Sequence, residues 1–151
     1  MQGVAPPGHT AAAAASALSK LMTWHLNGAW QSAELEGKTP CVLHQADWLV
    51  SLLTDVRDST DWNNSLKLGF DPVALEWPLW MTSQPWSHLL PPVVRPPGAN
   101  VAGLTAMAAA RTGLSCDCIV TAGTTDSIAA FLAAGVTQAC HNPFPSNAPF
   151  P

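Results

Sequence analysis

The stretch CIVTAGTTDSIAAFLAAG, residues 118–135, decides the fold class of this chain. It opens with a short β-branched run that predicts a strand, and a Gly-Thr-Thr turn follows. The alanine-rich remainder predicts a helix, and Gly135 is its expected stop. A strand that leads through a tight turn into a helix indicates an α/β protein. We expect the core of this unit to include four apolar side chains: Ile119, Ile128, Phe131 and Leu132.

Asp126 is the single acid of this stretch, and it falls in the first turn of the expected helix. The helix dipole favours an anion there, which keeps the carboxylate ionised. A base that accepts a proton from a hydroxyl must be ionised, and ligands of α/β folds gather where strands end and helices begin. The residue type and position leave two interpretations open. Asp126 is either a helix cap that contributes about 1 kcal/mol or a catalytic base.

Hydrophobic spacing predicts further helices over residues 11–26, 44–55 and 101–113, and a short one at 77–81. The first should bury Leu18, Leu21, Met22 and His25. The second should carry an apolar side made of Trp48, Leu49, Leu52 and Leu53. Residues 89–100 are interrupted by prolines and should be extended. Because one clear strand cannot build a sheet, much of the sheet is expected to be missing.

The chain divides into three parts by composition. Residues 1–15 contain a Pro-Pro-Gly run and are expected to be a disordered N-terminus, and residues 16–138 should form the structured domain. Residues 139–151 are rich in proline, which continues neither a helix nor a sheet, and they are expected to form a disordered tail.

The charge balance excludes several partners. Charged residues make up 11 % of the sequence, well under the quarter that is usual for soluble proteins. We therefore expect exposed apolar surface that supports association with more protein. With 6 Lys and Arg and a net charge of −4, the chain offers no basic patch for nucleic acid. No run approaches the ~18 apolar residues that span a bilayer, so we expect no membrane partner.

The four cysteines are expected to be free thiols, and no metal site is expected. Cys116 and Cys118 form a C-x-C pair, whereas redox and zinc motifs use C-x-x-C, and a structural zinc site needs four well-spaced ligands. Free thiols indicate a reducing compartment. We expect the cytoplasm, with the chloroplast as the alternative.

The segment VTAGTTDSIAAFLAAG resembles the acidic loop of the FGGY family of carbohydrate kinases. The family pattern is G-x-x-D-x-x-A-A-x-x-G, matched here by Gly123, Asp126, Ala129 and Ala130, with Leu132-Ala133 before Gly135. HQADWLVSLLT, TDWNNSLKLGFDP and PPVVRPPGANVAGLTAMAAARTGL resemble three other family motifs in the same order, although Asp55 replaces a glycine. The resemblance covers about residues 16–138 and is nearest to the pentulose kinases of plants and cyanobacteria.

The resemblance implies a ribonuclease H-like, actin-type ATPase fold, of which this chain is part of the first lobe. It implies ATP and Mg²⁺ as cofactors and a pentulose, ribulose or xylulose, as the small-molecule substrate. Asp126 matches the catalytic base of the family. Trp62, Asp61 and Thr125 are the candidate sugar-binding residues. A packing role for Trp62 and a structural role for Asp61 remain open, and Asn64 is expected to hold the loop by hydrogen bonds.

Several family motifs are absent from the sequence. It has no G-x-D-x-G-T turn, no S-L-G-T-S phosphate turn and no Walker-type loop. We therefore expect a kinase fragment that is inactive by itself, and its apolar surfaces should make the isolated chain marginally stable. The alternatives are a catalytically dead interaction module and an independent sugar-binding module.

Overall fold

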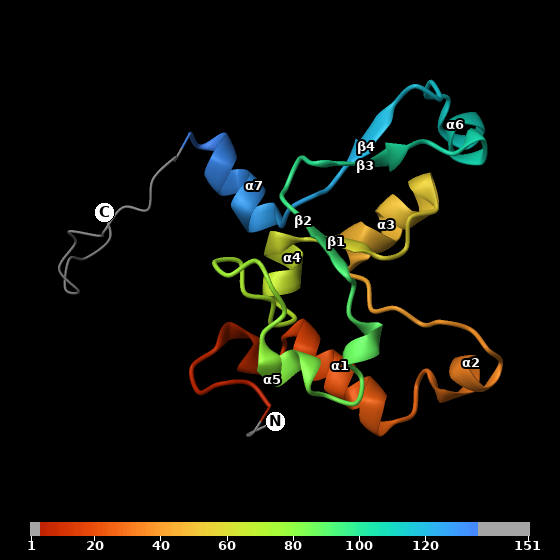
Figure 1. The fold of residues 1–151 in the computed structure, drawn as a ribbon. Helices are drawn as coiled ribbons and strands as arrows, with labels where there is room; N and C mark the ends of the chain where they lie inside the picture. Colours follow the sequence, from red (N-terminus) through yellow and green to blue (C-terminus); the bar gives the residue numbers. More distant parts are fainter. Residues whose placement is uncertain (1–3, 136–151) are drawn as a thin grey trace.

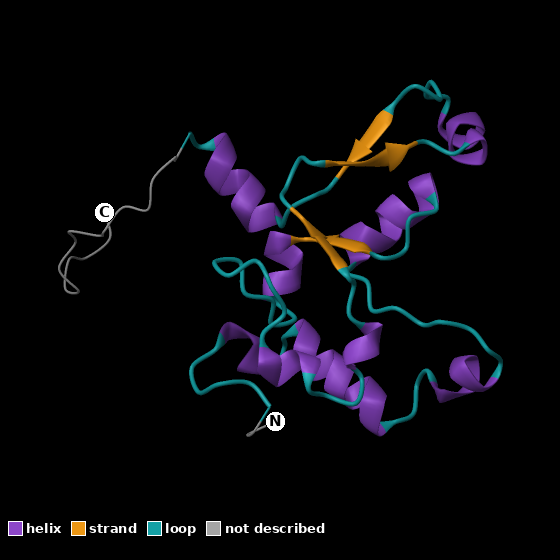
Figure 2. Cartoon of the chain, in the orientation of Figure 1, coloured by secondary structure: helices purple, strands orange, loops and turns teal. Residues whose placement is uncertain are grey.

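The computed structural model describes residues 4–135 as a mixed arrangement of helices and short strands (Figures 1 and 2), which confirms the general α/β class. The expected tail at 139–151 lies outside the described residues. The α-helices and 3₁₀ helices are η1 (Thr10–Ala12), α1 (Ala17–Leu26), α2 (Gln31–Leu35), α3 (Gln45–Thr54), α4 (Trp62–Leu66), α5 (Leu79–Thr82), η2 (Ser87–Leu89), α6 (Ala106–Thr112) and α7 (Asp126–Ala133). The strands are β1 (Ser59–Asp61), β2 (Val93–Arg95), β3 (Asn100–Gly103) and β4 (Ile119–Thr121).

The strands form two separate sheets, each of two strands in the described part of the chain. β1 pairs with β2 in parallel, with Thr60 opposite Val94. β3 pairs with β4 antiparallel, with Ala102 opposite Val120. The sequence predicted β4 and the extended segment that contains β2. It did not predict β1 or β3, because Ser-Thr-Asp and Asn-Val-Ala-Gly have weak strand propensity and become strands through pairing.

The main core lies where α1 packs against the segment from Leu68 to Leu90, in the lower half of Figure 1. Leu18 and Leu21 of α1 are buried there, as their helical spacing predicted. Trp86 is the largest fully buried side chain, with 1 % of its surface exposed. The lower half of the molecule therefore holds most of the large apolar side chains that are removed from water.

The N-terminal segment differs from the expectation of disorder over residues 1–15. Residues 10–12 form η1, and Ala11 is completely buried in the main core. The His9 side chain accepts a hydrogen bond from the backbone N–H of Ala11 at 3.1 Å and begins this turn. Ser16 then caps α1 by accepting from the N–H of Ser19 at 3.1 Å. The alanines predicted helix formation but gave no sign that one of them would be a core residue.

Helix α3 buries its polar side and exposes its apolar side. Its buried residues are Asp47, Ser51 and Thr54. The exposed fractions are 52, 50 and 55 % for Trp48, Leu49 and Leu52. The buried hydroxyls are satisfied within the helix, since Ser51 and Thr54 donate to carbonyls three and four residues earlier at 2.7 and 2.8 Å. The sequence pattern identified the apolar side of α3, but most of that side faces solvent.

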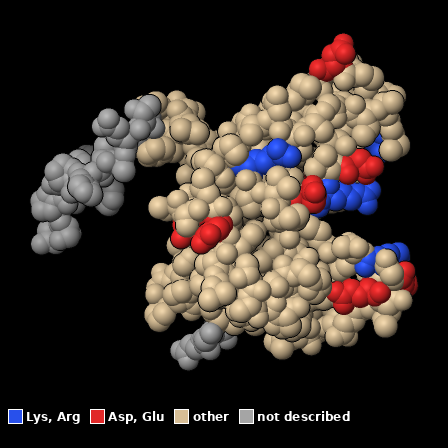
Figure 3. Space-filling model, viewed as in Figure 1, with Lys and Arg blue, Asp and Glu red and all other residues tan. Residues whose placement is uncertain are grey.

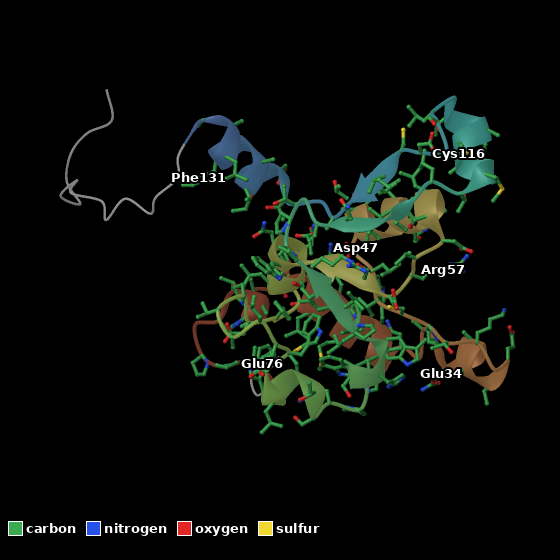
Figure 4. The ribbon with its side chains drawn as sticks, turned by 45° about the horizontal axis from the view of Figure 1, so that its top comes forward. Glu34, Asp47, Arg57, Glu76, Cys116 and Phe131 are labelled. Atoms are coloured by element: carbon green, nitrogen blue, oxygen red, sulfur yellow. The ribbon has the colours of Figure 1, made fainter. Side chains whose placement is uncertain are left out.

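The prediction that the apolar side chains of β4 and α7 form a core is wrong. Exposed fractions of 55, 37, 46 and 58 % are found for Ile119, Ile128, Phe131 and Leu132. Among the described strands β4 pairs only with β3, and no residue of α7 is buried. Figure 4 shows Phe131 on α7, which projects from the rest of the described chain. These apolar residues are spaced for packing, but no described element covers them.

Candidate functional site

A pocket of about 750 Å³ opens where segments far apart in the sequence meet. They are the start of α1 and the residues before it, the start of α3, the α4 region and the turn before α7. Figure 1 shows that α7 starts beside α4. The volume is in the range of small-molecule sites, which is about 300–1,000 Å³. The polar groups that line it include Ser16, Lys20, His44, Asn64, Lys67 and Asp126.

Asp126 lies on the wall of this pocket as the first residue of α7, which confirms its expected place at the helix start. The chain leaves β4, turns at residues 122–125 and enters α7 with Thr125 as the N-cap. The Oδ1 atom of Asp126 accepts a hydrogen bond from the N–H of Ser127 at 2.8 Å. Its Oδ2 atom has no hydrogen-bond partner among residues 4–135. The exposed carboxylate therefore keeps one oxygen available for a ligand.

The turn before Asp126 is tied to α4 by side-chain contact. Asn63 Nδ2 donates to Thr124 Oγ1 at 2.7 Å, across 61 positions of sequence. Thr125 is buried, with 6 % of its surface exposed, and it lines the pocket. Asn64 holds its own loop by hydrogen bonds, as the sequence predicted, since its side-chain amide donates to Asp61 Oδ2 at 2.6 Å. The link to the turn before Asp126 is made by its neighbour Asn63, which was not predicted. Asn63 is one polar residue among several, and nothing in the local sequence indicates a partner 61 positions away. The hydrogen bond from Asn63 to Thr124 could therefore not be predicted.

Asp61 is a buried cap of α4 and does not line the pocket. It is 1 % exposed. Its Oδ1 atom accepts from the backbone N–H groups of Asn63 and Asn64 at 2.9 and 3.0 Å, and its Oδ2 atom accepts from Asn64 Nδ2 at 2.6 Å. Trp62, the first residue of α4, is half-buried and also lies outside the pocket wall. The pocket therefore brings together Asp126 and Thr125, but not Asp61 and Trp62.

His44 and Asp47 form a capping box at the start of α3, which sequence reasoning missed. Asp47 Oδ2 accepts from the N–H of His44 at 3.0 Å and lies 3.2 Å from His44 Nδ1. His44 lines the pocket, and its Nε2 atom is buried without a hydrogen-bond partner. The spacing of a polar residue and an acid three positions later was the available signal. A search for paired histidines, which looks for metal sites, does not detect a histidine that caps a helix.

The described cysteines are free: Cys41, Cys116 and Cys118. Burial raises the pKa of Cys41 to about 11, and the negative charges of Asp58 and Asp47 add to this. A raised pKa keeps the thiol protonated and unreactive near neutral pH. Cys41 lies away from the pocket wall and is not assigned to the site.

Within residues 4–135, no three His, Cys, Asp or Glu side chains gather in a way that could hold a metal ion. The same residues include no helix with the length and apolar character needed to cross a bilayer. No protein-family model matches this sequence.

Proposed function

We propose that the chain is part of an ATP-dependent carbohydrate kinase of the FGGY type that phosphorylates a pentulose such as ribulose or xylulose. In this proposal the residues belong to the first lobe of a ribonuclease H-like fold and carry the sugar side of the site. The observation that supports it is the position of Asp126. The family resemblance marks this residue as the base, and it lies on the wall of the pocket between α1, α3, α4 and α7.

The chemistry assigned to Asp126 is proton acceptance. A sugar hydroxyl bound within hydrogen-bond reach would donate to the carboxylate and transfer its proton as it attacks the phosphoryl group. Asp126 Oδ1 is already engaged with the N–H of Ser127, so Oδ2 is the acceptor. Asn64 and Thr124 line the same pocket and offer an amide and a hydroxyl to orient the sugar.

The sequence lacks the phosphate-binding turns of the family, so the proposal places no ATP site in it. Mg²⁺ in kinases is held by carboxylates together with the phosphates, and no metal-binding cluster exists in residues 4–135. The proposal therefore assigns the nucleotide and the metal to polypeptide outside these residues. The chemistry proposed for Asp126 concerns the sugar hydroxyl alone.

The alternative is a catalytically dead interaction or sugar-binding module derived from the same lobe. The apolar side of α3 and the exposed apolar residues of β4 and α7 favour an interaction role, because large exposed apolar surfaces mark contact sites. Such a module would bind a sugar without transferring a phosphoryl group to it.

Two measurements on the 151-residue chain separate these proposals. We expect calorimetric titration to show binding of D-ribulose or D-xylulose, with binding weakened in Asp126→Asn and retained in Asp117→Asn. Asp117 is a matched control, because it is an exposed acid in the loop before β4. We also expect no ATP consumption with any ketose. Sugar binding that is equal in all three proteins would contradict the assigned site, and no binding at all would leave the interaction module as the better proposal.

A further inference from the structure

The cations of this chain are few, and two of them lie on the pocket wall. The sequence contains 6 Lys and Arg, and charged side chains are sparse on the face shown in Figure 3. Lys20 of α1 and Lys67, which follows α4, both line the pocket. Because the two residues lie on different elements, the fold and not sequence proximity brings them together.

Neither pocket lysine is neutralised within the described part of the chain. Of the four other cations, Lys38 pairs with Glu36 at 2.6 Å and Arg57 pairs with Asp55 at 3.0 Å. Arg95 donates to the Ser59 hydroxyl at 3.0 Å, and Arg111 has no ion pair among residues 4–135. No ion pair or side-chain hydrogen bond of Lys20 or Lys67 exists among residues 4–135. Two unpaired positive charges at one pocket, in a protein with a net charge of −4, indicate a negative ligand group.

The acids around the pocket do not cancel this charge. Asp126 is the single carboxylate on the described wall, and two lysines outnumber it. Asp47 lies behind the wall, where its Oδ2 is engaged by the backbone and ring of His44. His44 belongs to the same wall, and its Nε2 atom is buried without a hydrogen-bond partner among the described residues. The remaining groups at the wall include the hydroxyls and amides of Thr10, Ser16, Gln45, Asn64 and Thr124.

We propose that this pocket binds a small polyhydroxylated anion, a sugar that carries a phosphate or a carboxylate group. The hydroxyls and amides match the polyol part, and Lys20 and Lys67 match the anionic group. The start of α1 at the pocket wall adds a favourable dipole, whereas Asp47 and Asp126 offset those at the starts of α3 and α7. The inference rests on the proposed sugar site and adds the charge of its ligand.

The test is calorimetric titration of the 151-residue chain with four probes: D-ribulose, D-ribulose 5-phosphate, D-gluconate and inorganic phosphate. We expect at least one of the two sugar anions to bind about tenfold more tightly than D-ribulose, and the advantage should shrink as salt rises. Tighter binding of D-ribulose 5-phosphate would identify a phosphate as the anionic group, and tighter binding of D-gluconate would identify a carboxylate. Inorganic phosphate should bind more weakly than the sugar anion, because it lacks the polyol part.

Lys20→Gln and Lys67→Gln should each weaken binding of the sugar anion about fivefold and change D-ribulose binding less than about twofold. Lys38→Gln is the matched control, because Lys38 is exposed and lies outside the pocket. D-Ribulose that binds as tightly as both anions would overturn this inference and leave the proposed sugar site standing. Anion binding unaffected by either pocket substitution would also overturn it. Lysine-dependent anion binding without any binding of D-ribulose would support the anion site and contradict the pentulose proposal.

Discussion

At the scale of single residues, the carboxylates of Asp61 and Asp126 have opposite situations. Asp61 is buried and accepts three hydrogen bonds, whereas Asp126 is exposed at the pocket with one oxygen unengaged among the described residues. A carboxylate whose oxygens both accept hydrogen bonds at a helix cap stabilises the fold, whereas one with an oxygen that accepts none can bind a ligand. The family resemblance predicted that both are site residues. Their different burial and hydrogen bonding indicate a structural role for Asp61 and leave Asp126 as the candidate.

Asp61→Ala should therefore lower the free energy of unfolding by about 2 kcal/mol, since it removes a helix cap and leaves buried donors without a partner. Urea unfolding followed by circular dichroism measures this, with Asp117→Ala as the control that changes stability little. A stable Asp61→Ala protein that has lost sugar binding would instead make Asp61 a direct ligand.

Asn63→Ala should detach the turn before α7, because the hydrogen bond to Thr124 is lost. The expected cost is about 1 kcal/mol, with faster hydrogen exchange at the first amides of α7. Asn100→Ala is the control, since Asn100 is exposed on β3. Unchanged exchange in α7 would show that the turn keeps its place without this bond.

Cys41 should react more slowly with iodoacetamide than exposed Cys116, because its pKa is raised from 9.0 to about 11. The same shift makes stability depend on pH. The contribution of the protonated thiol is fully present below pH 9.0 and is lost as the pH rises towards about 11. Mass spectrometry of timed labelling at about pH 8 checks the order of reaction. Faster labelling of Cys41 would contradict its burial.

At the scale of elements, the sequence predicted helices where apolar spacing or capping was clear and missed strands formed by pairing. Gly113 and Gly135 stand after α6 and α7 with φ of +73°, the left-handed conformation that glycine favours. Their stop signals were therefore readable from sequence. The polar strand β1 was not, because its pairing with β2 joins segments more than thirty residues apart. Local strand propensity does not predict pairing between segments that are distant in the sequence.

Leu52→Gln should reduce self-association of the chain while changing its free energy of unfolding by less than about 0.5 kcal/mol, since Leu52 is 55 % exposed on α3. Leu21→Ala, at a fully buried position of α1, should cost about 2–5 kcal/mol. Sedimentation velocity and urea unfolding measure the two effects. A monomeric wild-type chain with a sharp, cooperative melt would contradict the assignment of α3 as a contact surface.

At the scale of the whole molecule, the described chain has a packed lower half and an upper half in which the large apolar side chains of α3, β4 and α7 are mostly exposed (Figure 1). The sequence predicted the apolar positions of β4 and α7 correctly as a pattern, but it could not show that no described element covers them. Asp126 was found through its place in the first turn of α7. Its neighbours in the pocket, Lys20 and His44, were not found, because a pocket is assembled from distant segments.

The role of Asp126 as the base at the sugar side of a kinase site is tested most directly by ketose-dependent ATP turnover. The protein to assay is a longer one that joins these residues to a nucleotide-binding half. We expect Asp126→Asn to lower kcat by at least ~100-fold with a smaller change in sugar affinity, because general base catalysis contributes about 10²–10⁴-fold. Asp117→Asn should retain wild-type turnover. Full activity in Asp126→Asn would contradict the proposed role and return Asp126 to that of a first-turn acid of α7.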